Sequence, residues 1–140
     1  MTTKDLPIEI RLAQGDIGEY DYARVVLSAA LEKIRRPGAW LQGATAENAA
    51  GEDTYPWAED ACAWCATGAI QAVEPDMRNV RQAAYRLLFT RGGMPRSTLS
   101  AFMSSPIVAY NDAAGRTQAE VVRLFEQAIG KETMALDIGA

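Results

Sequence analysis

Apolar side chains recur every three or four positions through most of the chain, which is the spacing of one face of an α-helix. Asp16 and Glu19 have the spacing of a capping box, and Pro37-Gly38 is a strong stop signal. The pattern therefore predicts a first helix from Asp16 to about Arg36. Its apolar face consists of Ala23, Val26, Leu27, Ala30, Leu31 and Ile34.

The same period predicts four more helices. They cover about 58–73, about 76–90, 97–103 and a last segment that begins at Thr117. Pro106 is expected to end the helix at 97–103, and Thr117 with Glu120 forms a second capping box. The inward positions of the helix at 76–90 and of the last helix are Val80, Ala84, Leu87, Leu88, Val121, Val122, Leu124, Phe125, Ala128 and Ile129.

A long stretch between the first two helices lacks this period. It is rich in Gly, Ala, Asn and acidic residues, which predicts a long acidic loop with at most a short turn of helix near Glu47. Four large apolar side chains within and beside it are expected to hold the loop against the core. They are Trp40, Leu41, Tyr55 and Trp57.

We therefore expect a mainly α fold, a compact bundle of four to five helices. The length of 140 residues fits a single domain over 1–140. Ile8 to Leu12 alternate as a strand would, so residues 1–15 are expected to form an arm or extended segment. The helical core is expected at 16–130 and a tail at 131–140.

Composition excludes several classes of site. The chain has no histidine, which removes Ser-His-Asp and Cys-His catalysis and every zinc site that needs an imidazole ligand. No apolar run approaches the roughly 20 residues that span a bilayer, and the polar N-terminus has no hydrophobic signal region. We expect a cytoplasmic protein with no membrane contact, no bound metal and no cofactor.

Cys62 and Cys65 have C-x-x-C spacing, which suits a redox pair, half of a zinc site shared across a dimer, or two small buried residues. A redox pair needs a strand-to-helix context, whereas both cysteines fall inside the alanine-rich helix predicted at 58–73. We favour the buried structural interpretation and expect Cys65 to be buried and inert in mid-helix.

Net charge is −4, but the charges are segregated along the chain. Between Pro37 and Asp76 there is no Lys or Arg, and between Met77 and Asn111 there is no acid. The two segments could lie against each other and cancel, which is the interpretation we favour. Alternatively, the acids bind a basic groove of a partner protein, or the arginines bind an anion beside a helix start. The arginines of the basic segment are Arg78, Arg81, Arg86, Arg91 and Arg96.

Two short motifs are more specific than a generic helical core requires. Trp64-Cys65 followed by Gly68-Ala69 favours close helix packing, with small residues beside a large ring. Asn111-Asp112 is expected just before a helix start, where short polar side chains satisfy unpaired N–H groups. Arg116 is expected to hydrogen-bond Asp112 and brace that turn.

The order and intervals of these segments resemble an uncharacterised family of small bacterial and phage proteins, a domain of unknown function. A Gly-Trp and small Gly-Ala segment comes first, here Gly38 to Ala44 with Ala39 inserted. Trp-Cys-x-x-Gly-Ala follows at 64–69, and then Trp-Asn-Asp leads to Gly-Arg-Thr, here 110–117 with Tyr110 in place of Trp. The resemblance covers about residues 20–130 and implies a small helical cytoplasmic protein without an assigned activity. Cys62 is not part of the pattern, which weakens the redox and metal interpretations.

We expect a non-enzymatic binding or regulatory protein that contacts another protein; a phage-encoded inhibitor of a host defence complex suits its size and charge. The partner-binding candidates are Glu47, Glu52, Asp53, Glu59 and Asp60. The alternative is a small-molecule or phosphate-binding domain, or an enzyme with Cys65 as nucleophile. Its candidate residues are Arg91, Arg96, Asn111, Asp112 and Arg116. The acidic balance disfavours general nucleic-acid binding, and the small-residue helix surface leaves a homodimer open.

Overall fold

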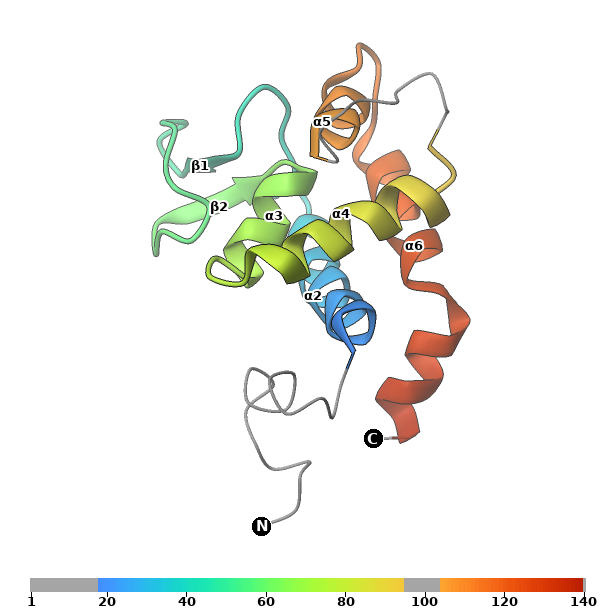
Figure 1. Ribbon diagram of the computed structural model, residues 1–140. Coiled ribbons are helices and arrows are strands. Elements are labelled where there is room, and N and C mark those ends of the chain that lie inside the picture. The colour runs from blue at the N-terminus through green and yellow to red at the C-terminus, as the bar shows by residue number, and fades with distance from the viewer. Residues whose placement is uncertain (1–17, 95–103, 140) are drawn as a thin grey trace.

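The computed structural model describes residues 18–94 and 104–139, and its side chains are described for 18–94 and 106–130. Within these residues, five helices surround a core and a two-stranded antiparallel sheet lies at one end (Figure 1). The helices are α2 (Glu19–Ile34), α3 (Ala66–Val73), α4 (Arg78–Arg91), α5 (Ser104–Asp112) and α6 (Gln118–Gly139). The strands are β1 (Ala46–Asn48) and β2 (Ala61–Trp64). This confirms the mainly α, single-domain helical bundle.

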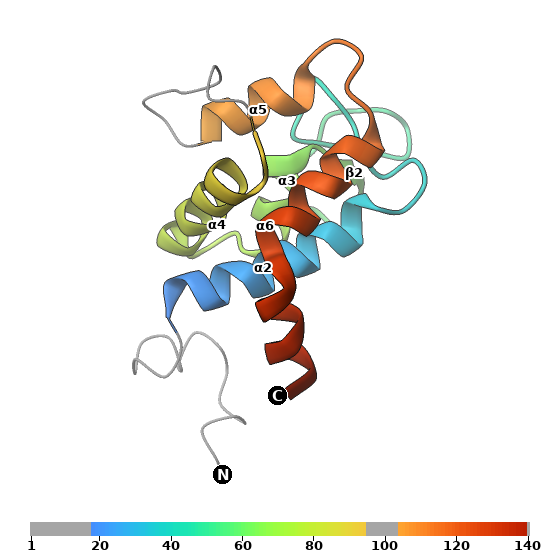
Figure 2. The same cartoon turned by 90° about the vertical axis from the view of Figure 1, so that its right-hand side faces the viewer.

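Helix α2 is the centre of the packing, since α3, α4 and α6 all contact it. Figure 2 shows α6 crossing α2 and α4 lying above it. All six apolar positions predicted for its inner face are buried, and the helix ends just before Pro37 as predicted. Its start differs, because Gly18 takes the N-cap position and makes no side-chain cap. Asp16 and the predicted arm lie outside the described residues.

The other two long helices also follow their predicted faces. The inward positions of α4 and α6 are buried, apart from the half-buried Val122. At the start of α6 the capping box is present: the Glu120 N–H donates to the Thr117 hydroxyl at 3.2 Å, and the Thr117 N–H donates to the Glu120 carboxylate at 2.9 Å. That backbone hydrogen bond from Thr117 lowers the pKa of Glu120 below its usual value. Gly130, at φ 74°, interrupts α6.

The segment between α2 and α3 is where the sequence prediction is wrong. Neither a helical turn near Glu47 nor a helix from residue 58 forms; β1 pairs antiparallel with β2, with Ala46 opposite Trp64. Tertiary hydrogen bonds explain the difference. The Trp64 N–H donates to the Ala39 carbonyl at 2.8 Å and the Leu41 N–H donates to the Trp64 carbonyl at 3.1 Å. These bonds hold the residues before Cys65 in an extended conformation, so the helix starts only at Ala66.

Helix α5 also departs from the prediction. The helix expected at 97–103 lies outside the described residues, and Pro106 sits in the first turn of α5 instead of ending a helix. A proline is tolerated there because first-turn N–H groups have no intrahelical partner. Asn111 and Asp112 end α5 instead of preceding a helix start. Across the described residues, we find no helix with both the length and the apolar character needed to cross a lipid bilayer.

Candidate functional site

The three sequence motifs meet at one buried side chain, Asn111, which is 1% exposed. Its Oδ1 accepts from the Trp40 indole N–H at 2.8 Å and from the Ala66 backbone N–H at 3.0 Å. Its Nδ2 donates to the Leu41 carbonyl at 3.0 Å and to the Asp112 carboxylate at 2.9 Å. We call this set of five residues the Asn111 junction. Every hydrogen-bonding atom of the Asn111 amide is satisfied within the protein, so the amide has no group left for a ligand.

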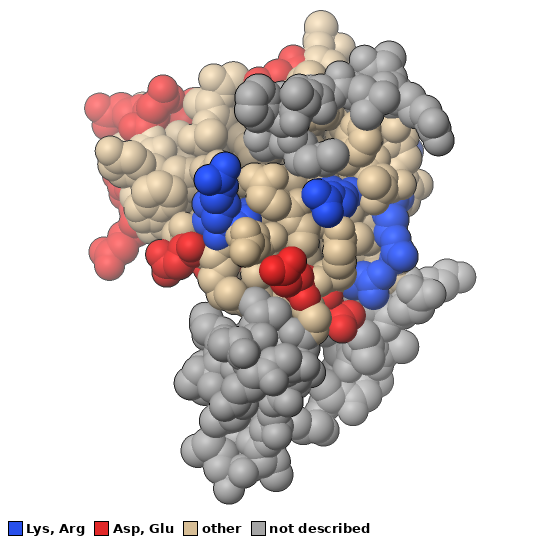
Figure 3. Space-filling view, in the orientation of Figure 1, with Lys and Arg blue, Asp and Glu red and all other residues tan. Residues whose placement is uncertain are grey.

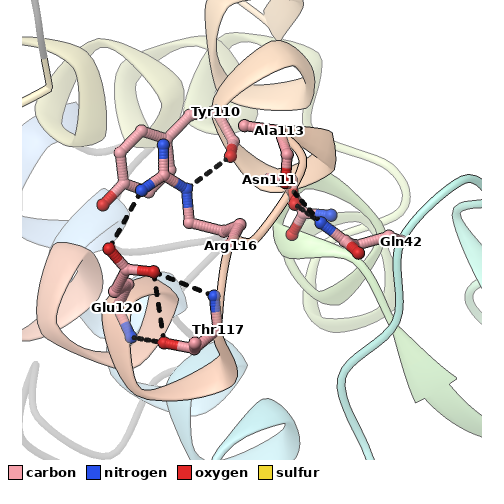
Figure 4. A network of polar contacts seen from close by, with 7 residues as sticks. All are labelled: Gln42, Tyr110, Asn111, Ala113, Arg116, Thr117 and Glu120. Atoms are coloured by element: carbon pink, nitrogen blue, oxygen red, sulfur yellow. Dashed lines mark hydrogen bonds and ion pairs between the residues drawn. The ribbon is translucent and has the colours of Figure 1, made fainter.

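The segment after Trp40 covers the end of α5. The Gln42 amide donates to the backbone carbonyls of Asn111 at 2.9 Å and Ala113 at 3.0 Å (Figure 4). The Gly43 N–H donates to the Asp112 carboxylate at 3.1 Å. Carbonyls at a helix C-terminus have no intrahelical partner, so Gln42 supplies the donors that α5 lacks. The Asn-Asp motif therefore fastens the chain around residue 42 to the helical core.

Arg116 does not bond to Asp112, contrary to the sequence prediction. Its Nε donates to the Tyr110 carbonyl at 2.8 Å and its Nη1 pairs with the Glu120 carboxylate at 3.1 Å (Figure 4). The guanidinium also lies 3.7 Å from the centroid of the Tyr110 ring. The prediction is wrong because Asp112 is already bonded to Asn111 and Gly43, while the turn after α5 brings Arg116 back over the last turn of that helix.

Cys65 is the N-cap of α3 and not a mid-helix residue. Its sulfur accepts from the Gly68 N–H at 3.4 Å and lies 3.3 Å from the Thr67 hydroxyl. Gly68 is required by close packing, because a Cβ at this position would lie 1.9 Å from the Thr45 carbonyl oxygen. The Trp64-Cys65-x-x-Gly motif thus starts α3 and leaves room for the backbone of Thr45 to pack directly against this helix. Burial of Cys65, at 4% exposure, is as predicted.

The geometry does not support a Cys62–Cys65 redox pair. Cys62 is exposed on β2 and Cys65 is buried, with the chain between them extended. Three extended residues span about 10 Å, beyond the roughly 7 Å limit for the Cα atoms of a disulfide. Within the part of the chain that the structure describes, no group of three thiols or carboxylates converges as a metal site would require.

The enzyme alternative needed Cys65 to meet Asn111 or Asp112 in an open site. The motifs do meet, through the Ala66 N–H, but Cys65 is enclosed by the core. Tyr85 is a titratable neighbour of this thiol. Burial raises the pKa of Tyr85, more than the Gln71 hydrogen bond lowers it, so the hydroxyl stays protonated and is a poor base.

The strands and the loop between them, residues 46–64, carry all five partner-binding candidates; we call this segment the acidic hairpin. Some of its carboxylates bond locally: Asn48 donates to Glu52 at 3.2 Å, and Thr54 donates to Asp60 at 3.1 Å. Asp53 and Glu59 are exposed. None of the ion pairs among the described residues involves these five carboxylates. Their charge is therefore not cancelled by salt bridges to the arginines of α4.

Figure 3 shows how the charges are distributed over one face of the molecule. Acidic side chains gather at the end formed by β1 and β2, basic side chains lie over α4, and further acidic side chains lie just below the basic ones in this view. Glu74, the one buried acid among the described residues, is structural: it accepts from the Tyr22 hydroxyl at 2.5 Å and from the Met77 N–H at 3.0 Å. It thereby joins α2 to the turn before α4.

Two aromatic residues of the acidic hairpin are exposed, which the sequence analysis missed. Tyr55 is 69% exposed and Trp57 is 54% exposed, so the prediction that both hold the loop to the core is wrong. Their rings stack on each other, with centroids 5.3 Å apart and planes 14° apart. Trp40 does contact the core, as predicted. The available signal was the Tyr-Pro-Trp sequence itself, since it lies within a run of acids and turn residues rather than in a helical period.

The anion-binding candidates are not brought together in the described structure. Arg91 is exposed in the last turn of α4, and a helix C-terminus presents carbonyls rather than N–H groups. Arg96 lies outside the described residues, and the donors of Arg116 are directed at Tyr110 and Glu120.

Comparison with protein families gives a match. Residues 20–131 match the model of a family of unknown function, DUF6197, and this range contains the Asn111 junction and the acidic hairpin. No curated protein and no solved structure is significantly similar to the chain. Because the match spans most of the sequence, the chain belongs to the DUF6197 family.

Proposed function

We propose that this chain is a non-enzymatic protein-binding protein, and that its acidic hairpin contacts a basic surface of a partner protein. The observation that carries the proposal is a coincidence of two features on one segment. Among the described residues, five carboxylates that form no ion pair share the hairpin with two of the four large apolar side chains that are exposed. Interfaces combine these features: aromatic residues dominate the binding energy, and complementary charge speeds association.

The hairpin is ordered by its own hydrogen bonds, which favours recognition. Asn48 accepts from the backbone N–H groups of Ala50 and Glu52, both at 3.0 Å, and so fixes the turn after β1. The Thr54 N–H donates to the Ala46 carbonyl at 3.1 Å. A surface that is already ordered loses less conformational entropy on binding than a flexible loop.

The family resemblance adds a cellular location and an origin to the proposal. We propose a cytoplasmic inhibitor, encoded by a phage or prophage, that acts on a host protein. An acidic surface suits such a role because it competes for basic grooves on other proteins. The anion-binding alternative lacks comparable support, since Arg116 is bonded within the chain.

Charge reversal on the hairpin tests the proposal. Tagged wild-type protein and an Asp53→Lys, Glu59→Lys variant would be used to capture partners from host lysate, with quantitative mass spectrometry and then binding of the purified partner. Neither side chain makes a hydrogen bond shown by the structure, so the variant should fold normally. We expect a partner that binds the wild type and not the variant, with affinity that falls as salt rises.

A Glu19→Lys, Asp76→Lys variant is the matched control. It changes net charge by the same amount at exposed positions outside the acidic hairpin, beside the start of α2 and before α4. Equal loss of binding in both variants would show that net charge alone matters, and full binding by the hairpin variant would remove the hairpin from the interface.

A further inference from the structure

The Tyr55–Trp57 pair has the properties of a cation-binding platform. Both rings are more than half exposed, and they stack face to face, so each ring has one face that the other ring does not cover. Resting on the protein-binding function above, we propose that this pair receives an arginine side chain of the partner protein, with the carboxylates of the acidic hairpin as hydrogen-bond acceptors.

The residue between the two rings holds them in place. Pro56 is buried, and its carbonyl accepts from the indole N–H of the buried Trp64 at 2.8 Å. The Ala58 N–H donates to the Tyr55 carbonyl at 3.0 Å, which closes a turn around the pair. Because Pro56 is anchored inward, its two neighbours are held outward. The platform is therefore formed before a ligand arrives, and binding does not have to order it.

The protein already contains the arrangement that we propose, at a half-buried position elsewhere in its own fold. The Arg116 guanidinium lies 3.7 Å from the Tyr110 ring centroid and pairs with Glu120 at 3.1 Å. At the acidic hairpin two of these three groups are present, the aromatic faces and the carboxylates. Neither ring has a Lys or Arg over it among the residues that the structure describes. The missing group is thus a cation, and no Lys or Arg lies between Pro37 and Asp76 to supply it from nearby in the sequence.

An arginine fits this platform better than a lysine. A guanidinium is planar, weakly hydrated and able to stack on a ring while donating two parallel hydrogen bonds to a carboxylate. A lysine ammonium is compact and strongly hydrated, so it loses more hydration at the same position. The two cations carry equal charge, so the charge of the acidic hairpin alone would not separate them. The carboxylates favour arginine through paired hydrogen bonds, and the aromatic pair adds the stacking contact.

The test compares a fluorescent nona-arginine peptide with a nona-lysine peptide of equal length, by anisotropy at about physiological ionic strength. An exposed cation–π contact is worth about 0.5–1 kcal/mol, so we expect the wild type to prefer nona-arginine by about two- to fivefold. A Tyr55→Ser, Trp57→Ser variant should lose most of this preference, because only the carboxylate hydrogen bonds then favour arginine. A Tyr55→Phe, Trp57→Phe variant keeps both ring faces and should restore the preference.

Tyr20→Ala is the matched control, because Tyr20 is an exposed aromatic of α2, outside the acidic hairpin. It should leave the preference unchanged. Equal affinity of the wild type for both peptides, or an unchanged preference in the double serine variant, would overturn this inference while leaving the acidic hairpin as a binding surface. If neither peptide binds, the proposed function and this inference both fail.

Discussion

Removal of the Asn111 side chain is the sharpest test of how the motifs hold the fold together. In Asn111→Ala the buried Ala66 N–H loses its acceptor, and the part-buried Trp40 indole N–H and Leu41 carbonyl lose their partners. A buried group left unsatisfied costs about 1–3 kcal/mol, and each part-buried bond is worth about 0.5–1.5 kcal/mol. We therefore expect a loss of about 2–6 kcal/mol, a large share of the roughly 5–15 kcal/mol that stabilises a domain.

Urea unfolding followed by far-UV circular dichroism measures this loss. With an m-value of about 1–3 kcal/mol/M, a 4 kcal/mol loss lowers the unfolding midpoint by about 1.3–4 M. Asn48→Ala is the control, because the half-buried Asn48 also makes several hydrogen bonds, and these are exposed to water. Water can replace those partners, so we expect its cost to be about 1 kcal/mol. If the two variants lose equal stability, or Asn111→Ala loses less than about 1 kcal/mol, burial is not what gives the junction its strength.

Three further predictions concern single positions. Gly68→Ala should cost at least about 1–3 kcal/mol in urea unfolding, because its Cβ would overlap the Thr45 carbonyl. In a native thiol titration with Ellman's reagent, Cys62 should react quickly and Cys65 only on unfolding, so two fast thiols would contradict the buried N-cap. Because the pKa of Glu120 is lower in the folded state than in the unfolded state, its ionised carboxylate stabilises the fold at pH values above the unfolded-state pKa, and this stability is lost as the pH falls through the folded-state pKa. Glu120→Gln should therefore reduce the fall in unfolding free energy at acidic pH, and an unchanged pH dependence would refute this prediction.

The long helices were predictable because burial of one face sets a period that the sequence repeats. In α2, α4 and α6 this period runs for three or more turns, with stops such as Pro37 and Gly92. A capping box is likewise local, and the one at Thr117 and Glu120 forms as predicted. These features depend on residues within four positions of each other, which a single sequence displays directly.

The acidic hairpin was not predictable for the opposite reason. Residues 61–64 are Ala, Cys, Ala and Trp, which suit a helix as well as a strand, and alanine favours the helix. Their extended form depends on hydrogen bonds from Trp64 to Ala39 and from Leu41 to Trp64, more than 20 positions away. The wrong prediction for Cys65 has the same cause. The predicted helix at 58–73 includes the end of β2, so Cys65 is expected in mid-helix although it is the N-cap of α3.

The candidate site was half predictable. The five carboxylates could be selected because their segregation is visible in the sequence, although our favoured interpretation was that the arginines would cancel them. Tyr55 and Trp57 were assigned to the core because large aromatic rings are usually buried there. Pro56 reverses that expectation, since its carbonyl accepts a hydrogen bond from Trp64 and Pro56 is the buried residue of the three. Only the packed structure shows which of three neighbouring residues turns inward.

The motifs and the proposed binding surface therefore have separate roles. Asn111 and Gly68 are buried, and the amide of Asn111 has no free hydrogen-bonding atom, so a ligand cannot recruit it. What they hold is the base of the acidic hairpin: Asn111 binds the Trp40–Leu41 segment that lies beside Trp64, and Gly68 lets Thr45 approach α3. The chain leaves the core between these two points and returns at Cys65, which is why the hairpin has a fixed orientation. The residues that specify the fold are thus buried at the base of the acidic hairpin, and the side chains available to contact a partner are the exposed ones on the hairpin itself.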